Sequence, residues 1–151
     1  MIIAFVGHGF LYNTDNLVAQ IEKTINECLR NEEAVQFLCG GYGDFDELCA
    51  CTLRKMKNCI PSCELILVTP YIDLSRQERL QCLMDARLYD AVVYPPLERV
   101  PYKYAIIKRN EWMIDKADLI ITYVKHSYGG AYKSLVYAKR KKKRIINLAE
   151  L

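Results

Sequence analysis

The sequence has no long hydrophobic run, although 52% of its 151 residues are hydrophobic. Its first apolar stretch, Met1–Val6, has no basic segment before it and is interrupted at Gly7. Such a stretch is too short for a membrane span or a signal peptide. We therefore expect a cytoplasmic protein without a membrane-bound part, in which a chain of this length buries one compact core.

The chain also has few residues in metal-binding patterns. It contains only two histidines, and its seven cysteines form no pair of C-x-x-C motifs. Without a secretory signal, an odd number of cysteines argues against a disulfide framework. We interpret the cysteines as reduced thiols that fill apolar positions, and we expect no metal and no cofactor.

Net positive charge is absent once one segment is set aside. The formal charge is +3, but the run Lys139–Arg144 supplies six positive charges, so the rest of the chain carries −3. A nucleic-acid-binding face is usually basic across the fold, whereas a basic run at a helix end complements the helix dipole. We interpret this run as a solvated turn and do not expect nucleic acid as a partner.

Repeats, linkers and other low-complexity segments are absent, which indicates a single domain over residues 1–151. Six apolar runs rich in branched or aromatic residues predict buried strands. Stretches with helical spacing separate them, and this alternation predicts parallel pairing. The predicted strands are Ile2–Val6, Val35–Cys39, Glu64–Val68, Ala91–Tyr94, Leu119–Val124 and Arg144–Leu148.

Five helices are predicted between these strands. The first presents Leu17, Ile21 and Ile25 on one face after a cap at Asn13 or Thr14. The fourth has Ile106, Ile107 and Met113 on its expected buried side. The second begins near Phe45 and stops before Pro61, and the others span about 75–88, 104–116 and 131–141. The pattern predicts an α/β protein: a Rossmann-like, doubly wound, mainly parallel sheet of about six strands flanked by helices.

Two glycine pairs stand where such a fold binds its ligands. Gly40-Gly41-Tyr42-Gly43-Asp44 and Gly129-Gly130 each follow a predicted strand and precede a predicted helix. Glycine lets the backbone approach a ligand, and a helix N-terminus offers free N–H groups to an anion. In open parallel sheets, ligands bind at the carboxyl ends of the strands. The segments expected there are Gly7-His8-Gly9, Gly40–Asp44, Thr69-Pro70-Tyr71, Tyr94-Pro95-Pro96 and Lys125–Gly130.

Three segments together resemble a known family. They are Phe37–Asp46, the stretch Lys108-Arg109-Asn110-Glu111-Trp112-Met113 running into Ala117–Ile121, and Tyr128-Gly129-Gly130-Ala131. In order and spacing they resemble the SLOG superfamily of Rossmann-like proteins, which includes the LOG phosphoribohydrolases, the DNA-processing protein DprA and the YpsA-like proteins. The resemblance covers nearly the whole chain and is greatest to the small YpsA-like bacterial and phage proteins. It implies a nucleotide-type ligand in the glycine-lined rim and favours a homodimer.

One departure from the LOG pattern bears on catalysis. LOG enzymes cleave the N-glycosidic bond of a nucleoside monophosphate with an arginine and a glutamate that ends the motif P-G-G-x-G-T-x-x-E. The resemblance places Arg109 at the arginine, but Val136 stands where the glutamate belongs. The resemblance therefore implies the phosphate-binding half of such a site, whereas the departure at Val136 argues against the LOG reaction.

Substitute carboxylates follow the first glycine pair. Asp44, Asp46 and Glu47 lie in the first turn of the second predicted helix, and Glu47 reproduces the spacing G-G-x-G-x-x-x-E. Cleavage of an N-glycosidic bond needs a carboxylate near the anomeric carbon. The alternative is that these acids cap free N–H groups and complement the helix dipole. Because they would repel a phosphate, we expect the phosphate at Gly129 and Gly130.

Other candidates are single residues on the rim. An imidazole at His8 would bond a ribose hydroxyl or protonate a leaving base, and a backbone-bonded loop histidine is the alternative. Arg109 would grip phosphate through its guanidinium. The predicted catalytic residues are Glu47, Asp46 and His8, and the predicted ligand-binding residues are Gly7, His8, Gly40, Gly41, Gly43, Asp44, Thr69, Arg109, Asn110, Ser127, Gly129 and Gly130.

Three hypotheses of function follow. The first is the binding or sensing of a nucleotide or nucleotide derivative, such as a nucleoside monophosphate or an ADP-ribose-type compound. The second is an N-glycoside hydrolase or transferase that uses Glu47 or Asp46. The third is a nucleic-acid module like DprA that uses Lys139–Arg144.

Overall fold

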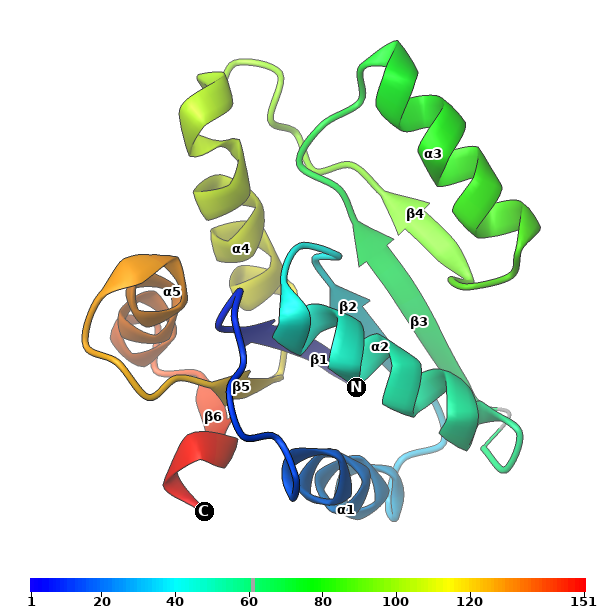
Figure 1. The fold of residues 1–151 in the computed structure, drawn as a ribbon, viewed down its shortest axis with the longest axis vertical. Coiled ribbons are helices and arrows are strands. Elements are labelled where there is room, and N and C mark those ends of the chain that lie inside the picture. Colours follow the sequence, from blue (N-terminus) through cyan, green and yellow to red (C-terminus); the bar gives the residue numbers. More distant parts are fainter. Residues whose placement is uncertain (61) are drawn as a thin grey trace.

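The computed structural model describes residues 1–60 and 62–151, which form one six-stranded parallel sheet with helices on both faces (Figure 1). The strand order is β4-β3-β2-β1-β5-β6, and every neighbouring pair is parallel. This confirms the Rossmann-like α/β prediction. The strands are β1 (Ile2–Gly7), β2 (Val35–Cys39), β3 (Cys63–Val68), β4 (Ala91–Val93), β5 (Leu119–Tyr123) and β6 (Arg144–Asn147).

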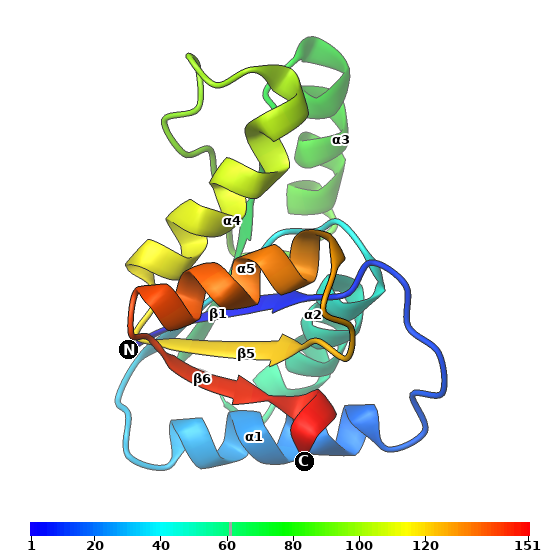
Figure 2. The same ribbon diagram turned by 90° about the vertical axis from the view of Figure 1, so that its left-hand side faces the viewer.

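Helices α1 (Leu17–Leu29) and α2 (Asp44–Lys57) cover one face of the sheet, and α4 (Ala105–Lys116) and α5 (Gly129–Arg140) cover the other (Figure 2). Helix α3 (Leu74–Asp85) lies beside β3 and β4 on the side of α2 (Figure 1). Two 3₁₀ turns, η1 (Tyr102–Tyr104) and η2 (Leu148–Glu150), precede α4 and follow β6. None of the helices described is long and apolar enough to cross a membrane.

Alternation along β1 divides the core between the two faces. Ile3 and Phe5 pack in the cluster under α1 and α2, whereas Ala4 and Val6 pack under α4 and α5. All four are buried, because a central parallel strand is covered on both sides. Burial of a side chain such as Phe5 contributes about 1.5–3 kcal/mol, so this strand anchors both layers.

The start of one helix differs from the sequence-based expectation. The N-cap of α1 is Asn16, whose side chain makes no capping hydrogen bond, and neither Asn13 nor Thr14 occupies the cap. Thr14 accepts a backbone bond from Leu17 (2.9 Å), and Asn13 has a φ of 53°. The preceding loop therefore turns at Asn13 and delays the helix. Helix α2 ends at Lys57, before position 61 as predicted, and Pro61 itself lies outside the described residues.

The buried side of α4 also differs from the prediction. Ile106 is exposed and Ile107 is half-buried, so of the three expected residues only Met113 is fully buried. The stripe that faces the sheet consists of Ala105, Arg109, Met113 and Ile114. The hydrophobic pattern was misleading because a charged residue, Arg109, takes a core position.

Candidate functional site

The direction of strand order reverses between β1 and β5, which is the point where open α/β sheets bind ligands. A crevice opens there, with a volume of about 550 Å³ including its mouth. It is formed by the loop after β1, the loop after β2 with the start of α2, the middle of α4 and the start of α5. Its lining residues are Phe5, Val6, Gly7, Gly9, Tyr42, Asp46, Ile106, Arg109, Asn110, Gly130 and Ala131.

Arg109 is the largest fully buried side chain in this region, with 1% of its surface exposed. Its Nη1 donates to the carbonyls of Gly40 (2.6 Å) and Val68 (2.7 Å), and its Nε donates to Oδ1 of Asn110 (2.8 Å). A Cβ on Gly40 would lie 2.7 Å from Cζ of Arg109, so a side chain there would displace the guanidinium from this position. Arg109 thus ties the ends of β2 and β3 to α4 while forming part of the crevice wall.

Asp46 is the carboxylate that lines the crevice. It is buried, and its Oδ2 accepts a hydrogen bond from the backbone N–H of Tyr42 (3.2 Å). Burial raises the pKa of Asp46 to about 6, against the opposing effect of Arg109. Burial likewise lowers the pKa of Arg109. A carboxyl group with a pKa near 6 is suited to proton transfer and to hydrogen bonding with a hydroxyl-rich ligand.

The N-terminus of α5 forms the opposite wall. Gly129 has a φ of 85°, and a Cβ at Gly129 or Gly130 would meet no atom within 4 Å. The first turn carries no acid, and the N-cap, Tyr128, makes no side-chain capping bond. These N–H groups are therefore available to an anion, and the space beside them is open.

His8 supports the loop that leads into α5. Its Nε2 accepts hydrogen bonds from the backbone N–H groups of Lys125 (2.9 Å) and His126 (3.4 Å). Burial lowers the pKa of His8, and the nearby His126 and Lys125 lower it further. The imidazole is thus a neutral acceptor that holds residues 125 and 126, as in the backbone-bonded alternative considered for it.

The three acids at the start of α2 point to different places. Asp44 accepts a hydrogen bond from the backbone N–H of Leu11 (3.0 Å), which fixes the loop after β1. Asp46 faces the crevice. Glu47 is exposed, lies 3.7 Å from Nη2 of Arg54 and lines a separate hollow between α2 and α3. The structure therefore brings Asp46 and Arg109 together, and it places Glu47 apart from Gly130.

Of the remaining predicted residues, some line one of the two hollows, and Gly43 and Ser127 line neither. Gly40, Gly41 and Thr69 line the α2–α3 hollow, and Gly43 packs against the backbone of Gly9. Asn110 lines the crevice and donates to Oγ of Ser134 (3.3 Å). Ser127 is exposed in the loop before α5.

Sequence reasoning missed Tyr42 as a site residue. Tyr42 lines both hollows, and the guanidinium of Arg109 lies 5.6 Å from its ring centroid. Its position within the Gly40–Gly43 motif was the available signal. Only the structure shows that its side chain stands between the two spaces.

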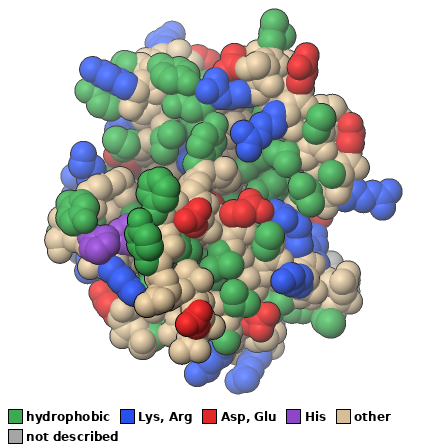
Figure 3. Space-filling model, viewed as in Figure 1, with side chains coloured by type: hydrophobic (Ala, Val, Ile, Leu, Met, Phe, Trp, Pro, Cys, Tyr) green, Lys and Arg blue, Asp and Glu red, His purple; other side chains and the backbone are tan. Residues whose placement is uncertain are grey.

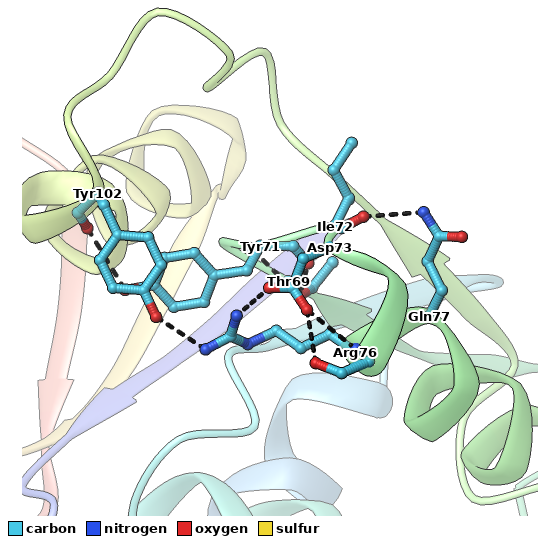
Figure 4. Close-up of polar contacts among 8 residues, drawn as sticks. Thr69, Tyr71, Ile72, Asp73, Arg76, Gln77 and Tyr102 are labelled. Carbon is cyan, nitrogen blue, oxygen red and sulfur yellow. Dashed lines mark hydrogen bonds and ion pairs between the residues drawn. The ribbon is translucent and has the colours of Figure 1, made fainter.

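A second aromatic group connects the loop after β3 with η1 (Figure 4). The rings of Tyr71 and Tyr102 stack with centroids 4.4 Å apart, and Arg76 lies over Tyr71. Arg76 also pairs with Asp73 and donates to the hydroxyl of Tyr102 (2.8 Å). These contacts link α3 to the start of α4 above the carboxyl ends of the strands.

The basic run lies at the other edge of the sheet. Helix α5 runs back from the crevice, so Lys139 and Arg140 occupy its last turn, far from Gly130 along the helix (Figure 2). Lys143 donates to the carbonyls of Asp115 (2.8 Å) and Ala117 (2.9 Å). The run is thus partly engaged in structural contacts, and it does not contribute to the crevice.

No family model and no curated protein matches this chain. It is similar in fold to two solved structures. One concerns the single-stranded DNA binding mode of DNA processing protein A from Helicobacter pylori (15% identity, TM-score 0.63, 96% of this chain and 63% of that chain). The other is DprA from Streptococcus pneumoniae (17% identity, TM-score 0.65, 95% of this chain and 48% of that chain). This chain thus spans about half to two thirds of the length of those chains.

The comparison supports the Rossmann-like fold that DprA shares and corrects one expectation. A neighbour studied for its binding of single-stranded DNA contradicts the expectation that nucleic acid is not a partner. That expectation rested on the confinement of the excess positive charge to one run. Aromatic rings and a free helix N-terminus bind nucleotides without a uniformly basic surface, so the spread of basic charge was a poor criterion.

Proposed function

We propose that this protein, as a SLOG-type domain, binds a nucleotide through its phosphate in the crevice between β1 and β5. The observation that carries the proposal is the free N-terminus of α5, which opens into the crevice lined by Arg109. The guanidinium and the helix N-terminus supply positive charge, and the carboxyl group of Asp46 would hydrogen-bond ribose hydroxyls. The ligand class is a nucleoside monophosphate or an ADP-ribose-type compound.

The test compares nucleoside monophosphates with their nucleosides by isothermal titration calorimetry. We expect binding only with the phosphate, and we expect Gly130→Asp to weaken it at least ten-fold, or about 1.4 kcal/mol. The added carboxylate would enter open space beside the phosphate. It would also favour the start of the helix, so the melting temperature should not fall.

Gly130→Asn is the matched control, because it has the same shape without the charge. It should bind like the unmodified protein. Arg109→Ala should also lose affinity, but it leaves the Gly40 and Val68 carbonyls without their donor and lowers stability as well. Equal affinity of Gly130→Asp and Gly130→Asn would contradict the phosphate site.

The proposal extends to catalysis at the same site. Asp46 is the candidate catalytic residue, because its carboxyl group lines the crevice and has a raised pKa. Chromatography of the same mixtures would detect a released base. If hydrolysis occurs, Asp46→Asn should abolish it and Glu47→Gln should not, because Glu47 lies in the other hollow. The reverse result would assign the reaction to Glu47.

We also propose single-stranded nucleic acid as a second candidate ligand. Exposed aromatic residues follow four of the parallel strands and therefore share the edge that holds the crevice. They are Phe10 (80% exposed), Tyr42 (42%), Tyr102 (64%) and Tyr128 (70%). Rings of this kind stack with unpaired bases, each contributing about 1–3 kcal/mol. The similarity to DprA supports this candidate.

Fluorescence anisotropy with a labelled oligothymidylate would test this candidate. We expect salt-sensitive binding that Tyr128→Ala weakens at least five-fold, whereas Tyr137→Ala, on the other half of α5, leaves it unchanged. A double variant, in which Gln replaces Lys139 and Lys142, distinguishes binding at the aromatic edge from binding at the basic run. If the double variant loses affinity and Tyr128→Ala retains it, the nucleic acid binds at the basic run and not at the aromatic edge.

A further inference from the structure

The hollow between α2 and α3 is distinct from the crevice. It has a volume of about 550 Å³ including its mouth, and it lies over the end of β3. Leu67, Leu80 and Leu83 form apolar walls, and Tyr89 closes one side. The hollow shares one lining residue, Tyr42, with the crevice.

The hollow exists because α3 packs loosely. None of the residues of α3 is fully buried, and Leu80, Leu83 and Met84 reach the core only as half-buried side chains. The helix is held at its start, where Asp73 caps it by accepting from the backbone N–H of Arg76 (3.2 Å), and where Arg76 joins Tyr71 and Tyr102 (Figure 4). A ligand beneath α3 would bury apolar surface that the folded chain leaves partly exposed.

Charge around the hollow favours an anion. Arg76 is paired with Asp73, and Glu47 lies near Arg54. Arg79, which is exposed at the mouth, takes part in none of the ion pairs between described residues. On the face shown in Figure 3, acidic side chains lie near the start of α2, and both basic and acidic side chains lie above them, toward α3. One cationic group is therefore left for a ligand.

We propose that the α2–α3 hollow is a second binding site, for a small planar aromatic ligand that carries one negative charge. The leucine walls and the rings of Tyr42 and Tyr89 bind the flat apolar part. Tyr89, 6% exposed, has its hydroxyl near Gly41, where it forms a hydrogen bond with a polar edge of the ligand. Arg79 binds the anionic group at the mouth. This site does not depend on a nucleotide in the crevice.

The probe is 1-anilinonaphthalene-8-sulfonate, a planar aromatic anion whose fluorescence rises in apolar surroundings. We expect one dye per chain. Arg79→Glu should weaken its binding at least ten-fold, because it reverses the charge at the mouth. Lys23→Glu makes the same change on an exposed residue of α1 and should leave the affinity unchanged. Equal affinity in these two variants, or no dye bound, would overturn the proposal.

Two further measurements locate the dye. Leu83→Trp should exclude it by filling the hollow, and bound dye should slow amide hydrogen exchange in residues 74–85 because it packs under α3. Gly130→Asp, which alters only the crevice, should retain the dye. Loss of the dye in Gly130→Asp with retention in Leu83→Trp would place it in the crevice and overturn the proposal, whatever the nucleotide titrations show.

Discussion

At the level of single residues, two buried ionisable groups, Arg109 and Asp46, determine the charge of the crevice. Arg109 satisfies two backbone carbonyls and Asn110, and Asp46 accepts from the backbone at Tyr42. Each charge is disfavoured by burial and partly stabilised by the other. Because removal of one partner leaves the other charge uncompensated, these positions are sensitive to substitution.

Asp46 should make stability depend on pH. Its pKa is about 6 in the folded protein, and its ordinary value is near 3.8. Between these values the folded state retains a proton that the unfolded state has lost. Stability from this group is therefore greatest below about pH 4 and falls as the pH rises to about 6, by about 3 kcal/mol in total. Urea unfolding at pH 4, 5, 6 and 7 measures the change.

Asp46→Asn should remove this part of the pH dependence, because the amide does not ionise. Asp15→Asn, at an exposed position in the loop before α1, is the control and should leave the dependence as it is. A pH profile that is the same in both variants would show that Asp46 is not the responsible group.

At the level of elements, the loop between β5 and α5 determines whether the N-terminus of α5 faces the crevice. His8 holds this loop through Lys125 and His126 by accepting from their N–H groups. A protonated imidazole has no acceptor lone pair, so these bonds require neutral His8. The β1 and β5 ends are thus joined by a group whose protonation would break both hydrogen bonds.

Acidification should loosen this loop. Because the pKa of His8 is lowered in the folded protein, its contribution to stability is present above about pH 6.5 and is lost as the pH falls through its folded-state value. Hydrogen-exchange protection factors of the Lys125 and His126 amides should fall over that range. His8→Gln should remove the pH dependence, whereas His126→Gln should keep it. An unchanged profile in His8→Gln would exclude this role.

The whole molecule is organised around one sheet that both hydrophobic clusters share. Phe5 and Val6, adjacent in β1, belong to opposite clusters, so neither face can separate without disrupting the central strand. This arrangement predicts one cooperative folding unit over the chain.

Differential scanning calorimetry should show a single transition. For 151 residues we expect an unfolding enthalpy of about 105 kcal/mol near 60 °C, equal to the van't Hoff value. Among the α-helices, exchange should be fastest in α3, which has no fully buried residue. Two transitions, or a calorimetric enthalpy well above the van't Hoff value, would contradict a single unit.

The local pattern of the sequence was sufficient to predict the strands. Each predicted strand lies within one residue of the observed one at both ends, because buried parallel strands are short apolar runs bounded by polar or turn residues. Strand order is not encoded locally. The parallel pairing inferred from strand–helix alternation nevertheless identified the edge where the loops meet.

The chain by itself thus determined the fold class, the succession of elements and the edge that carries the glycines, because these depend on neighbours a few residues apart. Tertiary structure alone decided that Arg109 is buried beside Gly40, 69 residues away, and that Asp46 and Glu47 face different hollows. Adjacent residues on a helix diverge by about 100°. The direction in which each one points therefore depends on what the rest of the molecule packs against it.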